Sequence, residues 1–201
     1  SGGHTELNLM TDHLTYQRLG GTLDDAAGEA FDKVARLLGL PYPGGPSIQR
    51  VAENGNPTGI HLPRAWLEGT WNFSFSGLKT AVLRLVNDYK GSNPDAKVEN
   101  VVPVANLAAS FQEAVVDVLV TKTLQAARTY KVKDIVVAGG VSANHALRTA
   151  FLSQSEFKVH IPPLSMCTDN AIMIAVAGYY RFLNGQRDSL DFDVLPSWRL
   201  S

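Results

Sequence analysis

A short apolar segment that ends in two glycines and is followed at once by a helix start restricts the fold of this chain more than any other feature. Residues 134–140 read Asp-Ile-Val-Val-Ala-Gly-Gly, an apolar run of strand length bounded by a glycine turn. Ser142, Ala143 and Asn144 then begin a segment whose pattern predicts a helix to about Leu152. Because strands joined to helices by short turns are the repeating units of α/β proteins, the chain is predicted to have an α/β fold.

The rest of the chain alternates between the same two kinds of segment. Alternating polar and apolar side chains predict a strand at residues 6–10, and a second short apolar run predicts a strand at 158–161. Apolar residues at helical spacing predict helices at 24–39, near 47–53, at 76–86, through 107–119 and at 168–183. Proline and glycine turns occupy most of residues 40–75. We expect the helices at 76–86 and 107–119 to pack on a sheet.

Composition narrows the class of protein. The chain has 201 residues, of which 45% are hydrophobic, so a sizeable core is expected. Eighteen basic and nineteen acidic side chains give a formal charge of −1, which excludes a basic protein that coats nucleic acid but leaves room for a local basic patch. Cys167 is the single cysteine, so no internal disulfide can form, and a reducing compartment is favoured.

The termini and the apolar segments indicate where the protein acts. No apolar run approaches the roughly 18 residues that cross a bilayer, and the first residues lack the basic and apolar parts of a signal peptide. We therefore expect a cytoplasmic protein that does not contact a membrane. Since the chain opens on a tight glycine turn, we also expect it to be a fragment whose preceding strand is missing.

Two glycine turns lie beside predicted strands, one at Ser1, Gly2 and Gly3 and the other at Gly139 and Gly140. Glycine there lets backbone N–H groups approach a phosphate or a flat base closely, although it also simply completes a tight turn. Asn144 follows the second turn, where its side chain either binds a ligand or caps the helix. Both interpretations remain open at this point.

Two carboxylates and a proline–glycine corner are further candidates. Asp32, on a predicted helix, either accepts the hydroxyls of a ribose or is a solvated helix position. Residues 43–46, Pro-Gly-Gly-Pro, form either a rigid loop beside a ligand or a corner. Asp169 is either one ligand of a metal ion or a helix cap. The five histidines have no metal-binding spacing, so a complete metal site is not predicted, and Cys167 is interpreted as a small buried residue.

Six segments, read in order, resemble one known family. They are Ser-Gly-Gly-His-Thr (1–5), Asp-Asp-Ala-Ala-Gly-Glu-Ala-Phe-Asp-Lys (24–33), Tyr-Pro-Gly-Gly-Pro (42–46), Phe-Ser-Phe-Ser-Gly-Leu-Lys-Thr (73–80), Ala-Gly-Gly-Val-Ser-Ala-Asn (138–144) and Cys-Thr-Asp-Asn (167–170). Together they resemble the TsaD family, the tRNA N6-adenosine threonylcarbamoyltransferases, once labelled O-sialoglycoprotein endopeptidases. The resemblance covers essentially all of this chain but not all of the family's length.

The resemblance implies a fold. Family members have the actin/Hsp70/acetate-kinase fold, in which two ribonuclease-H-like lobes hold a nucleotide between them. This chain is similar to the second lobe, with a mixed sheet flanked by helices. Residues 1–165 are then the nucleotide-binding lobe, and residues 166–201 are a C-terminal helix and tail that return to the missing first lobe.

The resemblance also implies roles for single residues. Ser1, Gly2 and Gly3 are expected to contact the phosphate or the threonylcarbamoyl group. The ribose is expected to lie against Asp32 and Gly45, and the adenosine against Gly139, Gly140 and Asn144. Asp169 is expected to bind one Fe²⁺ or Zn²⁺ together with two histidines of the first lobe. No protein nucleophile is implied.

The activity implied by the resemblance is transfer of the threonylcarbamoyl group from threonylcarbamoyl-AMP to N6 of adenosine 37, in tRNAs that read codons beginning with A. Other adenine nucleotides (ATP, ADP, AMP) are expected to bind at the same place, and TsaB and TsaE are the expected partner proteins. The fragment alone is expected to be inactive.

Three alternatives remain beside this interpretation. A kinase of the same fold is disfavoured by the segment at 73–80. A metalloprotease lacks a zinc motif here. A lobe that only binds nucleotide as a scaffold is the alternative from outside the enzymes.

Overall fold

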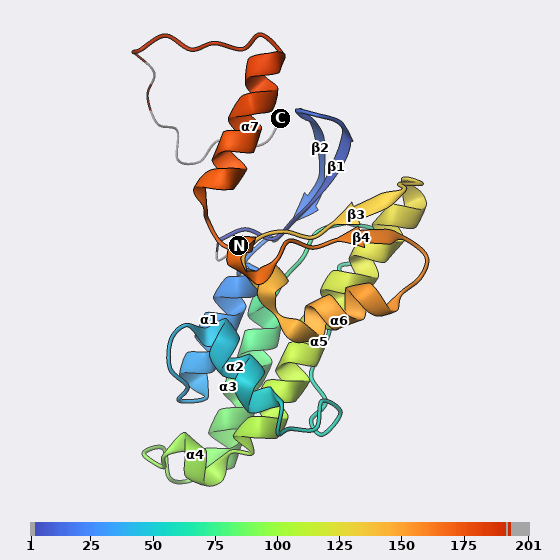
Figure 1. The fold of residues 1–201 in the computed structure, drawn as a ribbon. Helices are drawn as coiled ribbons and strands as arrows, with labels where there is room; N and C mark the ends of the chain where they lie inside the picture. Colours follow the sequence, from blue (N-terminus) through green and yellow to red (C-terminus); the bar gives the residue numbers. More distant parts are fainter. Residues whose placement is uncertain (1–2, 192, 194–201) are drawn as a thin grey trace.

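The computed structural model describes residues 3–191 and 193, so the predictions for Ser1 and Gly2 lie outside the described residues. It is an α/β arrangement of helices and two small sheets (Figure 1). In chain order its strands and α-helices are β1 (Glu6–Asp12), β2 (Thr15–Gly21), α1 (Ala27–Leu37), α2 (Gly44–Ala52), α3 (Ser76–Lys90), α4 (Val98–Val101), α5 (Val104–Thr129), β3 (Asp134–Val136), α6 (His145–Ser153), β4 (Lys158–His160) and α7 (Ala171–Leu183). The predicted α/β fold is confirmed at this level.

The strands form two separate two-stranded sheets. β1 and β2 form an antiparallel hairpin, in which Leu9 lies opposite Gln17, and β3 pairs in parallel with β4. The prediction of one mixed sheet is therefore wrong for the described residues. The physical reason is that a cavity separates β1 from β3, so that among the described residues no backbone hydrogen bond joins the two sheets.

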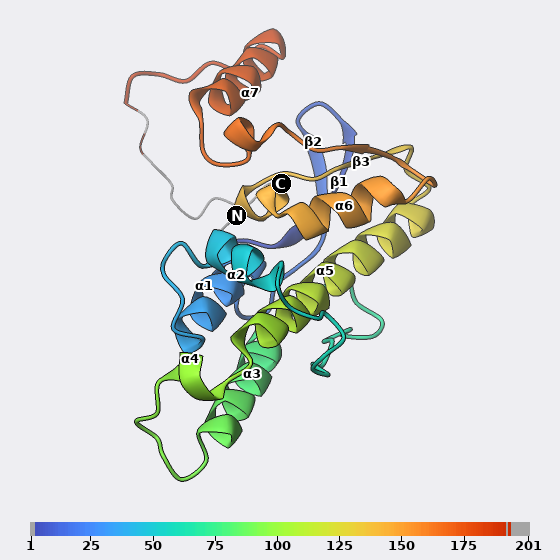
Figure 2. The ribbon, with the colours of Figure 1, turned by 60° about the horizontal axis from the view of Figure 1, so that its bottom comes forward.

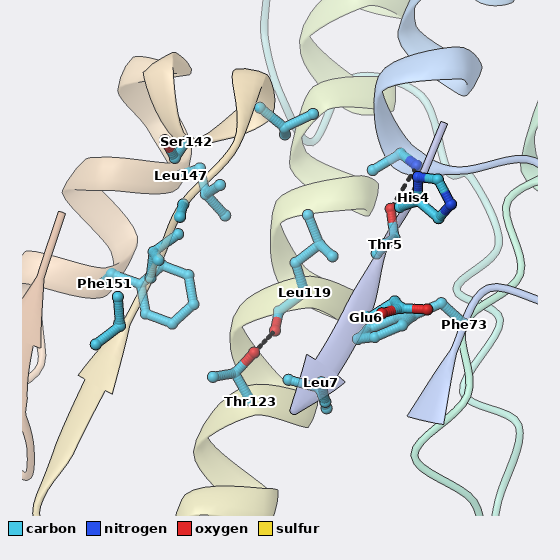
Figure 3. A pocket seen from close by; sticks show the side chains of 15 residues that line it. His4, Thr5, Glu6, Leu7, Phe73, Leu119, Thr123, Ser142, Leu147 and Phe151 are labelled. Carbon is cyan, nitrogen blue, oxygen red and sulfur yellow. Dashed lines mark hydrogen bonds between the residues drawn. The ribbon is translucent and has the colours of Figure 1, made fainter. Parts of the chain in front are cut away.

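A cavity of about 150 Å³ lies between the two sheets (Figure 3). Leu7 of β1 lines one side, Val137 after β3 lines the other, and Leu119 and Thr123 project into it from α5. Most of these side chains are apolar or short. The cavity therefore resembles unfilled core between sheet edges more than a polar reaction site.

Helices α1, α2, α3 and α5 pack into the main core. Phe111 of α5 is fully buried, and its ring meets that of Phe31 of α1 edge to face at 5.2 Å between centroids. A smaller cluster, which includes Ile135 and Phe151, lies beneath β3, β4 and α6. The two predicted helices at 76–86 and 107–119 thus pack mainly with other helices, because the sheets are too small to cover them.

α5 is a long helix that runs diagonally across the packed helices in both ribbon views (Figures 1 and 2). By length and composition it is apolar enough to span a membrane, so the expectation that no segment reaches this limit is wrong. Half of its most apolar 18-residue window is buried inside the structure, and its apolar side chains form the core with α1 and α2. The same pattern is expected of the central helix of a globular core.

α7 stands apart from the packed helices (Figure 2). None of its side chains is buried, although the helix is apolar, and Ile174, Phe182 and Leu183 are each more than half exposed. Its ring contact with the hairpin is the stacking of Tyr180 on His13, with 3.7 Å between centroids. α7 therefore presents an apolar surface that the described residues do not cover.

Asp24 caps α3 from 51 residues away, and this contact makes stability depend on pH. Its carboxylate accepts hydrogen bonds from the N–H of Phe75 at 2.9 Å, the N–H of Ser76 at 3.3 Å and the hydroxyl of Ser74. Burial acts to raise the pKa of Asp24, but these hydrogen bonds outweigh it, and the pKa lies below its ordinary value. The stabilisation is therefore present above about pH 4 and is lost as the pH falls through the lowered pKa.

An Asp24→Ala chain is expected to lose about 1–2 kcal/mol of unfolding free energy at pH 7, the usual cost of removing a helix cap. The difference from the wild type should shrink at pH 3, because this lies below the ordinary aspartate pKa of 3.8 and the stabilisation is lost as the pH falls toward the lowered pKa. Urea denaturation of both proteins at the two pH values measures this. An equal difference at pH 7 and pH 3 would contradict a role for the charged carboxylate.

Candidate functional site

Asp32 lies where α1 contacts the start of α2. Its Oδ1 accepts a hydrogen bond from the N–H of Gly44 at 2.8 Å, so it is not merely a solvated helix position. Gly44 is buried, and a Cβ added there would lie 2.5 Å from Cα of Asp32. A Cβ added at Gly45 would meet nothing within 4 Å. The start of α2 is thus held against Asp32, with open space beside Gly45.

The turn after β3 contains a backbone conformation that favours glycine, as its sequence suggests. Gly139 has a φ of +90°, a conformation that favours glycine, and Gly140 begins a 3₁₀ turn over Gly140–Ala143. A Cβ at Gly140 would meet nothing within 4 Å, so this backbone is approachable. Val141 packs against the core cluster that contains α1. The structure therefore brings this turn next to α1.

Asn144 is the N-cap of α6. Its Oδ1 accepts a hydrogen bond from the N–H of Leu147 at 3.0 Å, and its Nδ2 donates to Oε1 of Gln112 at 2.8 Å. The capping interpretation is confirmed. An amide nitrogen carries two hydrogens, so Nδ2 keeps one further donor beyond the Gln112 bond.

Side-chain hydrogen bonds between distant residues hold α1, α2 and α6 together. The sequence analysis did not predict them. Oε1 of Gln49, on α2, accepts from the N–H of His145 at 2.7 Å, which ties α2 to α6. Oγ1 of Thr5 accepts from the N–H of Ala27 at 2.9 Å, which ties the first turn of the chain to α1. No local pattern marks either contact, since Gln49 and His145 are 96 residues apart.

A buried carboxylate that pairs with two lysines lies just before the N-terminus of α1, and the sequence analysis did not identify it. Asp25 is 9% exposed and pairs with Lys33 at 2.6 Å and with Lys79 at 3.6 Å. Burial acts to raise the pKa of Asp25, but the hydrogen bond and charge of Lys33, with the charge of Lys79, hold it below its ordinary value. Asp25 is thus a charged anchor that joins α1 to α3.

Asp169 lies between the 3₁₀ turn Leu164–Met166 and α7. It is exposed, and within the described part of the chain its carboxylate forms no hydrogen bond or ion pair. Asn170 caps α7 instead, because its Oδ1 accepts from the N–H of Met173 at 3.1 Å, so the capping interpretation of Asp169 is wrong. Residues 3–191 and 193 contain no group of three or more His, Cys, Asp or Glu side chains able to hold a metal.

Together these features define an α/β protein in which the starts of α2 and α6 and the turn at Gly139 and Gly140 lie close to the carboxylate of Asp32. A family model described as "TsaD: tRNA N6-adenosine threonylcarbamoyltransferase" matches residues 1–176. The chain belongs to this family, as its motifs suggested.

Curated relatives carry the same name. The protein of Dehalococcoides mccartyi is 55% identical over 197 residues, 98% of this chain and 57% of the relative. Those of Bacillus subtilis and Thermomicrobium roseum are 52% and 53% identical, over 100% and 96% of this chain and 58% and 57% of the relatives. The chain therefore spans less than two thirds of the length of these relatives.

Proposed function

We propose that this chain is part of a protein that transfers the threonylcarbamoyl group from threonylcarbamoyl-AMP to N6 of adenosine 37, in tRNAs that read codons beginning with A. The observation that carries the proposal is the family match over residues 1–176, with relatives more than half identical that bear the transferase name. Because the chain spans 57% of the length of the first of these relatives, we propose that it is inactive without the remainder.

We also propose a more specific fold, in which residues 1–165 are one lobe of an actin-like fold and residues 166–201 return to the other lobe. Two observations support it. The facing edges of β1 and β3 are separated by a cavity lined by both, so a strand from outside these 201 residues would join the two sheets into one. The uncovered apolar side chains of α7 would be buried on the other lobe.

The nucleotide is proposed to lie against the two helix starts and the glycine turn. Backbone N–H groups at Gly3, Gly139 and Gly140 would donate to the phosphate or the base. Ser1 and Gly2, which lie outside the described residues, are proposed to contact the phosphate or the threonylcarbamoyl group because their motif matches that of the family. One oxygen of Asp32 is engaged by Gly44, and the other would accept from the ribose. Gly45 offers the open space beside it, and the remaining N–H of Asn144 would face the adenosine.

Asp169 is proposed as one ligand of an Fe²⁺ or Zn²⁺ ion whose two histidine ligands lie outside this chain. An exposed carboxylate that forms no hydrogen bond or ion pair among the described residues fits this role, and these residues alone do not make a complete site. A bound metal would polarise the acyl oxygen and orient the phosphate. The residues of this chain bind and orient the nucleotide, and none acts as a nucleophile.

Contacts to tRNA phosphates require basic surface, and this chain has a formal charge of −1, so it supplies little of that surface by its net charge. We propose that much of that surface belongs to the other lobe or to partner proteins, TsaB and TsaE, in the cytoplasm. A lobe that only binds nucleotide as a scaffold remains the second outcome of the experiment below.

An Asp32→Asn substitution separates the ribose role from the structural role of Asp32. The amide keeps an oxygen to accept from Gly44 but loses the charge, so the melting temperature should change little. The dissociation constant for AMP should rise about tenfold or more, the usual cost of a lost hydrogen bond to a charged group. Isothermal titration with AMP measures the dissociation constant, using a protein that includes the remainder present in the longer relatives. The control is the same substitution at an exposed aspartate, Asp88→Asn.

That titration, together with an assay of threonylcarbamoyl transfer to tRNA by the wild type, has three distinguishable results. Weaker AMP binding only in Asp32→Asn supports the site, and equal binding by both variants contradicts the role of Asp32. A wild type that binds AMP but transfers no threonylcarbamoyl group to tRNA would favour the scaffold and contradict the proposed reaction.

A further inference from the structure

Arg148, on α6, joins two segments that the proposed function uses but that lie far apart in the sequence. Its Nη1 donates to the backbone carbonyl of Ser142 at 2.8 Å, in the turn that precedes Asn144. Its Nη2 donates to the backbone carbonyl of Pro162 at 2.7 Å, and Nη1 also lies 3.6 Å from Sγ of Cys167. One guanidinium therefore connects the glycine turn to the loop formed by residues 162–170.

That loop is bonded internally from its first residue to Asn170. The thiol of Cys167, 3% exposed, lies 3.5 Å from the carbonyl oxygen of Pro163. Nδ2 of Asn170 donates to the carbonyls of Met166 at 3.4 Å and Thr168 at 2.9 Å. Asp169 lies inside this bonded segment, so its position follows that of the whole loop.

Arg148 connects this loop by hydrogen bonds to α6 and to the glycine turn. Among the side chains of residues 5–161, only that of Arg148 forms hydrogen bonds with the 162–170 loop, and no ion pair reaches it. The backbone pairing of the preceding strand ends at Val137 and His160. Without the guanidinium, the loop would keep its internal bonds but would lose its hydrogen bonds to α6 and the glycine turn.

We propose that Arg148 is a positioning residue that sets the 162–170 loop, and with it Asp169, relative to the turn that carries Asn144. This inference rests on the proposed function, in which Asp169 binds the metal and the turn faces the adenosine. It adds a residue that aligns the two halves of that site without touching either ligand.

The geometry explains why arginine stands at this position. Two nitrogens of one planar group reach two carbonyls that are 20 residues apart, whereas a lysine would have to reach both from one nitrogen at the end of a flexible stem. The acceptors are neutral, and within the described residues no carboxylate lies within ion-pair distance of Arg148. Arg148 therefore acts through the shape of its donors more than through its charge.

The first test uses Cys167 as a reporter of the loop. In the protein at the length of its relatives, we expect N-ethylmaleimide to label the Cys167 peptide about tenfold or more faster in both Arg148→Lys and Arg148→Met. Lost hydrogen bonds from a charged donor account for a change of this size in how often the loop opens. Mass spectrometry of that peptide measures the rate, and Arg84→Met, exposed on α3, is the control. A wild-type rate in Arg148→Lys overturns the proposal.

The second test separates positioning from general stability. Affinity for Zn²⁺, titrated alone, should fall about tenfold to hundredfold in both variants, the usual cost of removing support for a metal ligand. The dissociation constant for AMP should change less than about threefold, because Asp32 and Asn144 keep their own hydrogen bonds. A lower melting temperature with both affinities unchanged would mean a structural role only and would overturn the proposal.

The two proposals fail differently. If the wild type binds both AMP and Zn²⁺ and Arg148→Lys does so equally well, the role of Arg148 is wrong and the proposed function stands. If the wild type binds neither, the proposed function fails. The labelling rate needs no ligand, so it still decides whether Arg148 holds the loop.

Discussion

An Asp169→Ala variant of the protein at the length of its relatives is expected to lose its bound metal and at least about a hundredfold of its transfer activity. Removing a residue that only supports a metal ligand costs about tenfold to hundredfold, and removing a ligand costs more. The fold should be unaffected, since the side chain is exposed and forms no hydrogen bond or ion pair with the described residues.

Metal content by mass spectrometry, activity on tRNA and melting temperature together check this result. Asp95→Ala, which removes another exposed carboxylate on the loop between α3 and α4, is the matched control. Unchanged metal content in Asp169→Ala would contradict the role of Asp169 as a metal ligand. A large fall in melting temperature would show that the carboxylate has a structural role.

A Gly44→Ala chain is expected to be less stable by about 1–3 kcal/mol, the cost of forcing an extra methyl group into a packed interior. The new Cβ would lie 2.5 Å from Cα of Asp32 and 2.7 Å from the carbonyl oxygen of Phe31. Both are backbone atoms, so relief requires α2 to move away from α1. The bond from Gly44 to Asp32 should weaken, and nucleotide binding with it.

Gly45→Ala is the neighbouring control. Because its Cβ would meet no protein atom within 4 Å, it should leave unfolding free energy nearly unchanged. If the ribose lies where we propose, however, the same methyl group should weaken AMP binding. Thermal unfolding, in which about 2–4 °C corresponds to 1 kcal/mol for a chain of this size, distinguishes the two variants. Equal stability in both would contradict the close packing of α1 on α2.

Helices and strands with a strong local pattern were predicted well. The helix that includes Phe31 and the helix that includes Phe111 both form. The strand after Lys133 also forms, but it ends at Val136, before the glycine turn. The second hairpin strand, β2, was missed, because Thr15–Gly21 has little apolar alternation and is held mainly by pairing with β1. α1 begins at Ala27 and not at Asp24, because Asp24 is used to cap α3.

Candidate residues were found from their chemistry, but their partners were not. Asp32, Gly45 and Asn144 stood out as a carboxylate, a glycine and an amide at turns and helix starts. Their connections to Gly44 and Gln112 were not predicted, since a hydrogen bond between residues 12 or 32 positions apart leaves no mark on local periodicity. The proposed ligand roles of these residues remain predictions.

The sequence by itself determined the α/β class, the family and the residues with suitable chemistry, because periodicity, turn formers and motifs are local properties of the chain. Only the tertiary structure decided that the sheets are separate, that Asn170 and not Asp169 caps α7, and that Arg148 joins the glycine turn to the 162–170 loop. Such contacts depend on how packed elements bring distant backbone carbonyls within reach of one side chain, and distance in space is not encoded in sequence spacing.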